Sequence, residues 1–297
     1  MELFHALTDL KIADRFYQLV NPIHPNLSKL NMLISYTYFG DQEDTLIRLK
    51  REGKVLSTFL DAGTYGMNPD GMNPGLMDQY LVYLSWIFKV GHHFDYIASL
   101  DDRFNEPEHN WLNYHRLKAE LKTHDELHGT RLAEKLVPVI HSPETNDANG
   151  EMTPAEEFLR YIQQGAKTIG IGSSPRLGDK SMPAITKLRN ERGVRIHRFG
   201  NFDIRYIARW KIDSADSGRY FRSAQFGKDV FFWDSDRNKP IPVSIRTETL
   251  KPEYRTVLHD VFGWELDDLL VNVENIWMVN LFAHQKMQEF LTKTFAA

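Results

Sequence analysis

The chain has 297 residues, enough for one large domain, and 42% of them are hydrophobic, which excludes wholesale disorder. The net charge of −4 excludes a uniformly basic nucleic-acid-binding protein, and the absence of cysteine excludes disulfides and thiolate zinc sites. The sequence contains no run of about eighteen apolar residues and no pattern of a signal peptide near its start, so we expect a cytoplasmic protein without a membrane span.

The first half of the chain alternates between segments typical of helices and of strands. Residues 1–30 are predicted to be helical and then irregular. After them, stretches rich in β-branched and aromatic residues indicate strands, and charged or apolar stretches with helical spacing separate these strands. The expected strands are 31–39, 55–60 and 94–100, and the expected helices are 41–53, 77–89 and 110–132.

The alternation continues through the second half. Thr153-Pro154, followed by two glutamates, is a typical helix start. Another helix is expected over 183–192, and 230–233 is a candidate eighth strand. The other expected strands are 136–140, 167–171, 194–197 and 206–212.

Alternating strands and helices are the pattern of a parallel sheet with crossover helices. About eight such units in a chain of this length favour a closed barrel, and no Gly-x-Gly-x-x-Gly follows the first strand, which argues against a dinucleotide-binding fold. We therefore predict an α/β fold, a (β/α)8 TIM-like barrel with N-terminal and C-terminal helical additions. We expect a single domain over 1–297, with a barrel core at about 31–245 and a helical closure at about 250–297.

Polar residues stand at the carboxyl ends of the expected strands, which line one mouth of a parallel barrel. Separated carboxylates around a pocket suit glycosidic-bond chemistry, and they also suit a metal site with oxygen ligands. A structural role is the alternative, in which the acids cap helices or pair with Arg176, Arg198 or Arg209. The strand-end residues are Asp61, Asp101, Asp102, His141, Gly170, Gly172, His197 and Asp213.

Positive charge is concentrated between Lys187 and Lys211, a segment that contains eight Lys or Arg residues and only two acidic residues. A local cationic face of this kind could hold a phosphate backbone. A solvated helix followed by strand ends explains the same residues equally well.

Several short motifs resemble the tRNA-guanine transglycosylase superfamily. Asp61-Ala-Gly-Thr-Tyr is similar to the family's Asp-Ser-Gly-aromatic segment. Trp210-x-x-Asp213-Ser-x-x-Ser217 with Gln225-Phe-Gly227 resembles a block of the DpdA-like DNA-guanine transglycosylases of phages and bacteria. The likeness covers roughly 32–233, and further motifs fall in the family's order: Phe94 to Asp101, Pro138-Val-Ile-His141, Thr168-Ile-Gly-Ile-Gly172 and Val194-x-Ile-His197-x-Phe-Gly200.

The resemblance implies a base exchange that replaces guanine in DNA with a 7-deazaguanine through a covalent aspartyl-sugar intermediate. Asp213 matches the nucleophile, Asp61 the general acid/base, and Asp101 the acid that reads the purine edge. The partners would be DNA, with tRNA as the alternative, and the free 7-deazaguanine base, without a cofactor or metal. The base pocket would hold Asp101, Asp102, His141, Gly170, Gly172 and His197, and the nucleic-acid backbone would meet Arg198, Arg209, Lys211, Arg219 and Arg222.

Two departures from the family pattern leave alternatives open. The tRNA enzymes carry a Cys-and-His zinc site after the barrel, which this chain, without cysteine, does not have. Asp216 lies within the Asp213 motif and is a rival nucleophile, as Asp102 is a rival to Asp101. The other functions that fit are a tRNA base exchange, a DNA glycosylase that inserts no base, and a non-catalytic barrel that binds nucleic acid or a partner subunit.

Overall fold

The computed structural model describes residues 1–63, 76–101, 106–141, 152–172, 180–200, 203–218, 229–245 and 250–296. Asp102, Arg176, Arg219 and Arg222, which the sequence singles out, lie outside these residues. None of the helices within the described ranges has the length and apolar character needed to cross a membrane.

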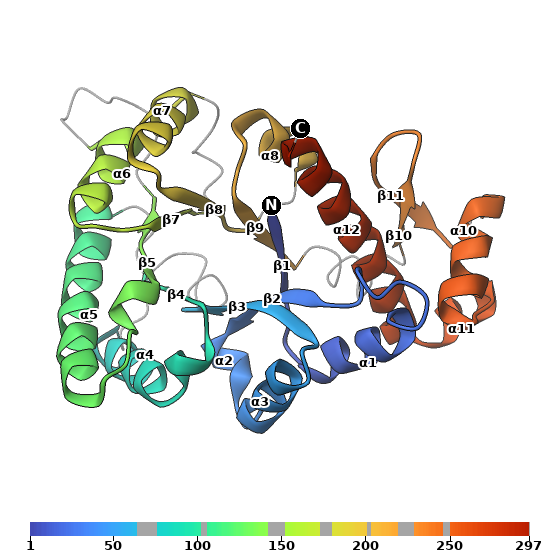
Figure 1. Ribbon diagram of the computed structural model, residues 1–297, viewed down its shortest axis with the longest axis horizontal. Coiled ribbons are helices and arrows are strands. Elements are labelled where there is room, and N and C mark those ends of the chain that lie inside the picture. Colours follow the sequence, from blue (N-terminus) through green and yellow to red (C-terminus); the bar gives the residue numbers. More distant parts are fainter. Residues whose placement is uncertain are drawn as a thin grey trace.

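Nine parallel strands of the described residues form one sheet in the order β5-β4-β3-β2-β1-β9-β8-β7-β6. Only Pro138 separates β5 (Leu136–Val137) from β6 (Val139–Ile140), so the two ends of this order are consecutive parts of one strand. The ladder continues across Pro138, whose carbonyl accepts a hydrogen bond from the Gly170 N–H at 2.7 Å. The sheet thus closes into an eight-stranded parallel barrel, which confirms the predicted fold class (Figure 1).

The barrel has one strand, β1 (Glu2–Ala6), before the first strand that the sequence predicts. Besides β1, β5 and β6, the barrel strands are β2 (Leu30–Ser35), β3 (Val55–Asp61), β4 (Tyr96–Ala98), β7 (Thr168–Ile171), β8 (Arg195–Arg198) and β9 (Ser214–Ser217). The prediction of a helical start over 1–30 is wrong at β1, which pairs with β2 on one side and β9 on the other. The barrel core therefore begins at Glu2 and not near residue 31, and only α1 (Lys11–Val20) is helical in that stretch.

The segment around residue 210 differs most from its prediction. The expected strand 206–212 is instead the helix α8 (Ile204–Trp210). Asp203 caps this helix, because its carboxylate accepts hydrogen bonds from the N–H groups of Arg205 and Tyr206. The last barrel strand is β9, whose sequence Ser-Ala-Asp-Ser has little strand propensity but is fully buried between β8 and β1.

The crossover helices surround the barrel on its outside (Figure 1). In chain order they are α2 (Tyr36–Phe39), α3 (Glu43–Arg51), α4 (Leu76–Val90), α5 (Pro107–His128), α6 (Pro154–Gln163), α7 (Met182–Arg192) and α8. With α1 between β1 and β2, these helices return the chain from the carboxyl end of one strand to the amino end of the next, and the short α2 precedes α3 within one such connection. The helix ends and the strand starts therefore share the amino-terminal face.

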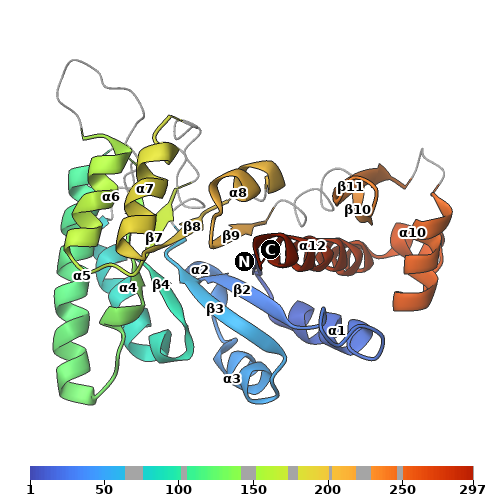
Figure 2. The ribbon, with the colours of Figure 1, turned by 45° about the horizontal axis from the view of Figure 1, so that its top comes forward.

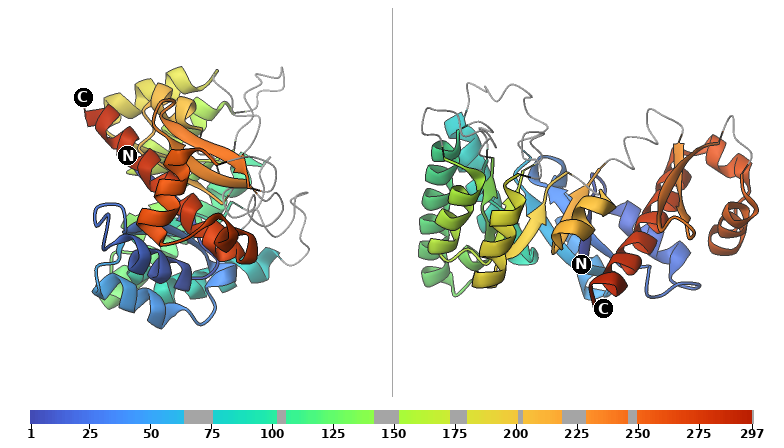
Figure 3. Two further views of the ribbon diagram at one scale, coloured as in Figure 1. Left: turned by 90° about the vertical axis from the view of Figure 1, so that its right-hand side faces the viewer. Right: turned by 90° about the horizontal axis from the view of Figure 1, so that it is seen from above.

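The expected strand at 230–233 exists but belongs to a separate hairpin. β10 (Asp229–Asp234) pairs with β11 (Lys239–Ser244) in antiparallel fashion, outside the barrel sheet. This hairpin lies to one side of the barrel with α10 (Pro252–Val257) and α11 (Leu266–Val271), as Figures 2 and 3 show. The long α12 (Val273–Ala296) covers β1, where Gln288 Oε1 accepts hydrogen bonds from the Leu3 N–H at 2.7 Å and from Asn31 Nδ2 at 3.0 Å.

Side chains fill the interior of the barrel in layers. Phe4, Leu33, Phe59, Ala98 and Val137 form a buried apolar layer with one residue from each of five strands. Below this layer, Arg195 donates hydrogen bonds to Glu2 and to the hydroxyl of Tyr96, which closes the amino-terminal end of the barrel. Chemistry is therefore confined to the carboxyl-terminal mouth above the apolar layer.

Candidate active site

Three carboxylates gather at the carboxyl-terminal mouth. Asp61 is the last residue of β3, Asp101 follows β4, and Asp216 lies in β9. Burial, together with the nearby negative charges of Asp101 and Asp216, raises the pKa of Asp61 to about 7. Two backbone N–H groups, of Gly63 and Ala62, oppose this shift, and the Gly63 N–H lies 3.0 Å from Oδ2. At neutral pH Asp61 can therefore both donate and accept a proton.

Asp101 and His141, two of the predicted site residues, are in contact at the mouth. His141 Nε2 lies 2.6 Å from Asp101 Oδ2, and both side chains are buried. The backbone N–H of His141 donates to Glu157 Oε2 at 3.2 Å, and Glu157 is itself a buried carboxylate of α6. The mouth thus places Asp101 in a fixed orientation on the side opposite to β9 in the strand order.

Gly170 in β7 and Gly172, just after β7, leave space that the side chains of other residues fill. A Cβ on Gly172 would overlap the ring of His141, and a Cβ on Gly170 would overlap the ring of Phe199. The resemblance to the transglycosylases places both glycines in the base pocket. The structure instead covers them with His141 and Phe199, so it is the surfaces of these rings that line this side.

Asp216 is held by donors from β8 and the residues that follow it. Its Oδ1 accepts a hydrogen bond from the Gly200 N–H at 3.0 Å and lies 3.2 Å from His197 Nε2. His197 is completely buried under Asp216, inside the barrel. The prediction that His197 contacts a bound base is therefore wrong, because the residue lies beneath the floor of the mouth.

Asp213 lies at the opposite end of the barrel. It stands just before β9 and accepts two hydrogen bonds from Arg189 of α7, at 3.0 and 2.7 Å, and a third from the Ile196 N–H at 2.8 Å. The prediction places Asp213 at the carboxyl end of a strand, but that strand is the helix α8. Of the two rival acids, Asp216 occupies the mouth, and Asp213 is a structural ion pair at the amino-terminal end.

Three of the five cations predicted to meet a nucleic-acid backbone lie within the described residues, and these three do not form one group. Arg198 is buried, donates to the carbonyl of Gly172, and has a pKa that burial lowers from its usual range. Arg209 and Lys211 are exposed, but they lie at the end of α8, on the amino-terminal face with Asp213. Arg198 therefore belongs to the wall of the mouth, whereas Arg209 and Lys211 lie at the other end of the barrel.

Tyr83 is a residue of the mouth that the sequence does not reveal. It lies on α4, and its hydroxyl donates a hydrogen bond to the Ala98 carbonyl at 2.7 Å. Burial raises the pKa of Tyr83 well above its usual range, and the charges of Asp61 and Asp101 act in the same direction. In the sequence, Tyr83 lies in an apolar helix and is indistinguishable from a core residue. It comes close to both acids only because the barrel closes.

A metal site finds no support in the part of the chain that the structure describes. There, no group of three or more His, Asp or Glu side chains is arranged to hold a metal ion. The carboxylates of the mouth contact histidines and backbone N–H groups.

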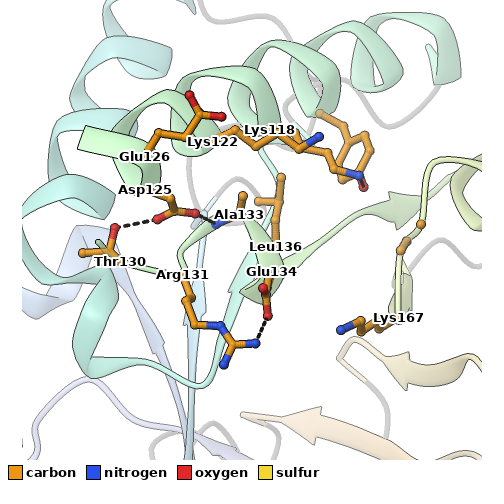
Figure 4. A pocket seen from close by; sticks show the side chains of 13 residues that line it. Lys118, Lys122, Asp125, Glu126, Thr130, Arg131, Ala133, Glu134, Leu136 and Lys167 are labelled. Atoms are coloured by element: carbon orange, nitrogen blue, oxygen red, sulfur yellow. Dashed lines mark hydrogen bonds and ion pairs between the residues drawn. The ribbon is translucent and has the colours of Figure 1, made fainter. Parts of the chain in front are cut away.

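A separate cavity of about 380 Å³ opens on the amino-terminal face, between the end of α5 and the starts of β5 and β7 (Figure 4). Cations and carboxylates alternate around it, and Arg131 donates to Glu134 across its edge. Asp125 is occupied by the Thr130 hydroxyl at 2.5 Å and by the Ala133 N–H at 2.9 Å. Several charged groups of this lining thus bond to one another or to the backbone around the cavity. The cavity lies at the end of the barrel away from the mouth.

Comparisons with known proteins identify no family for this chain. No model of a protein family matches the chain, and no curated protein matches its sequence. Among solved structures, the chain is similar to the YdjI aldolase from Escherichia coli K12, with 9% sequence identity and a TM-score of 0.49. That match covers 99% of this chain and 90% of the aldolase chain.

Proposed function

We propose that the protein is a base-exchanging transglycosylase that replaces guanine in DNA with a 7-deazaguanine base. The observation that carries this proposal is the pairing of two unlike carboxylates in one mouth. Asp61 has a pKa raised to about 7, whereas Asp216 is a carboxylate held by a histidine and a backbone N–H. A proton-carrying acid and a fixed nucleophile are the two groups that a retaining glycosyl transfer needs.

In the first displacement, Asp216 attacks C1′ of the deoxyribose and the C1′–N9 bond breaks. Guanine leaves with the electron pair of that bond and receives a proton from Asp61. In the second displacement, Asp61 removes a proton from the incoming 7-deazaguanine, whose nitrogen attacks C1′ and releases the carboxylate of Asp216. Two inversions give net retention, and the proton that Asp61 lost is returned to it.

Asp101 is the group that reads the base in this proposal. Its carboxylate is oriented by His141, and a carboxylate accepts hydrogen bonds from the two adjacent N–H groups of a guanine edge. A target within a duplex must be flipped out to reach the mouth. Arg219 and Arg222, which follow β9 in the sequence, remain predicted contacts to the phosphate backbone, and the reaction would take place in the cytoplasm of a bacterium or a phage-infected cell.

The deciding experiment offers the protein DNA and tRNA in parallel, each with radiolabelled guanine or a labelled 7-deazaguanine. We expect label in DNA and a covalent protein–DNA adduct that survives denaturation. Label in tRNA alone would assign the tRNA reaction instead, and base release without incorporation would indicate a hydrolysing glycosylase. Salt-sensitive DNA binding with neither label nor adduct would refute an enzymatic function.

A further inference from the structure

The barrel interior holds a histidine, directly beneath Asp216, that solvent does not reach. His197 is 0% exposed, and the rings of Phe4, Phe59 and Phe199 lie 5.7, 4.7 and 4.4 Å from it between centroids. A polar ring in such an apolar cage is costly unless its nitrogens are hydrogen-bonded. Both nitrogens have partners here: Nδ1 lies 2.9 Å from Ser214 Oγ, and Nε2 lies 3.2 Å from Asp216 Oδ1.

The chemistry of the three groups fixes the direction of these bonds. An ionised carboxylate only accepts, so Nε2 must carry the ring proton. The ring protonated on Nε2 alone accepts at Nδ1, and the Ser214 hydroxyl is able to donate to it. The sheet produces this arrangement, because His197 is the register partner of Ser214, and Ser214 and Asp216 are two residues apart on the same face of β9.

The two oxygens of Asp216 have different surroundings. Oδ1 receives both His197 Nε2 and the Gly200 N–H. Oδ2 accepts no hydrogen bond from any residue that the structure describes. Two donors on one oxygen fix the plane of the carboxylate and leave the other oxygen available for bond formation.

We infer that His197, oriented by Ser214, is a positioning residue that presents Asp216 Oδ2 to the sugar, an inference that rests on the proposed function. When the ester between C1′ and Oδ2 breaks in the second displacement, its electron pair returns to the carboxylate. Part of that charge develops on Oδ1, where His197 and Gly200 donate. Loss of His197 therefore slows breakdown of the covalent intermediate more than its formation.

The kinetic test compares His197→Leu with His197→Gln, which keeps an N–H donor. We expect His197→Leu to slow base insertion about 10- to 100-fold, as is typical of residues that orient a reacting group, with adduct accumulating. His197→Gln should recover most of the rate. The matched control is His5→Leu, because His5 is equally buried but lies on the outer side of β1 against Gln285 of α12. It should lower stability without accumulation of adduct.

A measurement on the ring separates this inference from the proposed function. Nitrogen-15 NMR of the histidine rings should show His197 protonated on Nε2 and accepting at Nδ1, and Ser214→Ala should reduce that population at least about twofold in this hydrogen-bonded network. Protonation on Nδ1 would overturn the inference even if the enzyme is inactive. Base exchange by a folded His197→Leu protein at the wild-type rate, without adduct accumulation, would also overturn it and leave the proposed function standing.

Discussion

Asp213 and Asp216 are the same residue type and lie three positions apart in the chain, yet they have opposite environments. Asp213 is neutralised by the guanidinium of Arg189 at the amino-terminal end of the barrel. Asp216 lies at the mouth, where its neighbours are a histidine, a backbone N–H and the further carboxylates Asp61 and Asp101. A β-strand of four residues is enough to separate an acid that stabilises the fold from an acid available for chemistry.

The two ends of the barrel repeat this difference. At the amino-terminal end Glu2 meets Arg195 and Asp213 meets Arg189, so the carboxylates there are paired with cations. At the mouth, Asp101 and Asp216 lie against histidines, and Asp61 accepts a hydrogen bond from the Gly63 N–H. The negative charges of Asp101 and Asp216 raise the proton affinity of Asp61, and a carboxyl group perturbed in this way is typical of functional sites.

The sharpest way to break the comparison is to remove each acid in turn. Asp216→Asn should reduce base exchange at least about 1,000-fold and abolish the covalent adduct, because it removes the nucleophile. Asp213→Asn is the matched control, and it should retain exchange within about threefold, since an amide oxygen can still accept from Arg189 and Ile196. Rates are measured with labelled base on protein checked for folding by circular dichroism. The reverse result, with Asp213 essential and Asp216 dispensable, would restore the sequence-based assignment.

The pH dependence of exchange should report on Asp61. Its pKa is raised to about 7, so the acid needed to protonate the leaving guanine is lost above that pH, with a rate loss of about tenfold per pH unit. Asp101→Asn removes one of the negative charges that raise this pKa, so the alkaline limb should move to lower pH. The profile of kcat/KM measures both, and a limb that stays in place in Asp101→Asn would mean that Asp61 is not the group that titrates.

The sequence predicts the barrel because regular strand–helix alternation is a strong signal, and it predicts Asp61, Asp101 and His141 because each follows an apolar strand. It fails where tertiary pairing overrides local propensity. Ser-Ala-Asp-Ser is a strand only because β1 and β8 flank it, and the apolar run before it packs as α8. That single error shifts the expected strand end from Asp216 to Asp213 and moves Arg209 and Lys211 to the wrong face.

Removing a carboxylate should change the free energy of unfolding in opposite directions at the two ends of the barrel. Asp213→Ala leaves Arg189 and the Ile196 N–H without their acceptor, so it should lower the free energy of unfolding by about 1–3 kcal/mol, a reduced value because the pair is partly exposed. Asp61→Asn should raise it, because it removes a buried carboxylate from beside Asp101 and Asp216. Urea denaturation measures both variants.

The pH dependence of the Asp61→Asn effect has a defined sign. A pKa raised from 3.8 to about 7 means that the folded protein holds the Asp61 proton where the unfolded chain has lost it. The wild type therefore loses stability relative to Asp61→Asn as pH rises from about 4 to about 7, by at most about 4 kcal/mol, and the difference is constant above that range. A difference that does not vary with pH would contradict the raised pKa.

The smallest effect is expected from the exposed cations of the amino-terminal face. Arg209→Gln and Lys211→Asn should leave exchange within about twofold and leave the salt dependence of DNA binding unchanged, because DNA held at the mouth does not reach them. Asparagine is chosen at position 211 because Lys211 has a φ of 50°, a left-handed conformation that asparagine tolerates. If each substitution instead reduces the slope of log Kd against log salt by about one, the DNA path extends down the wall of the barrel along α8 to the end where Asp213 lies.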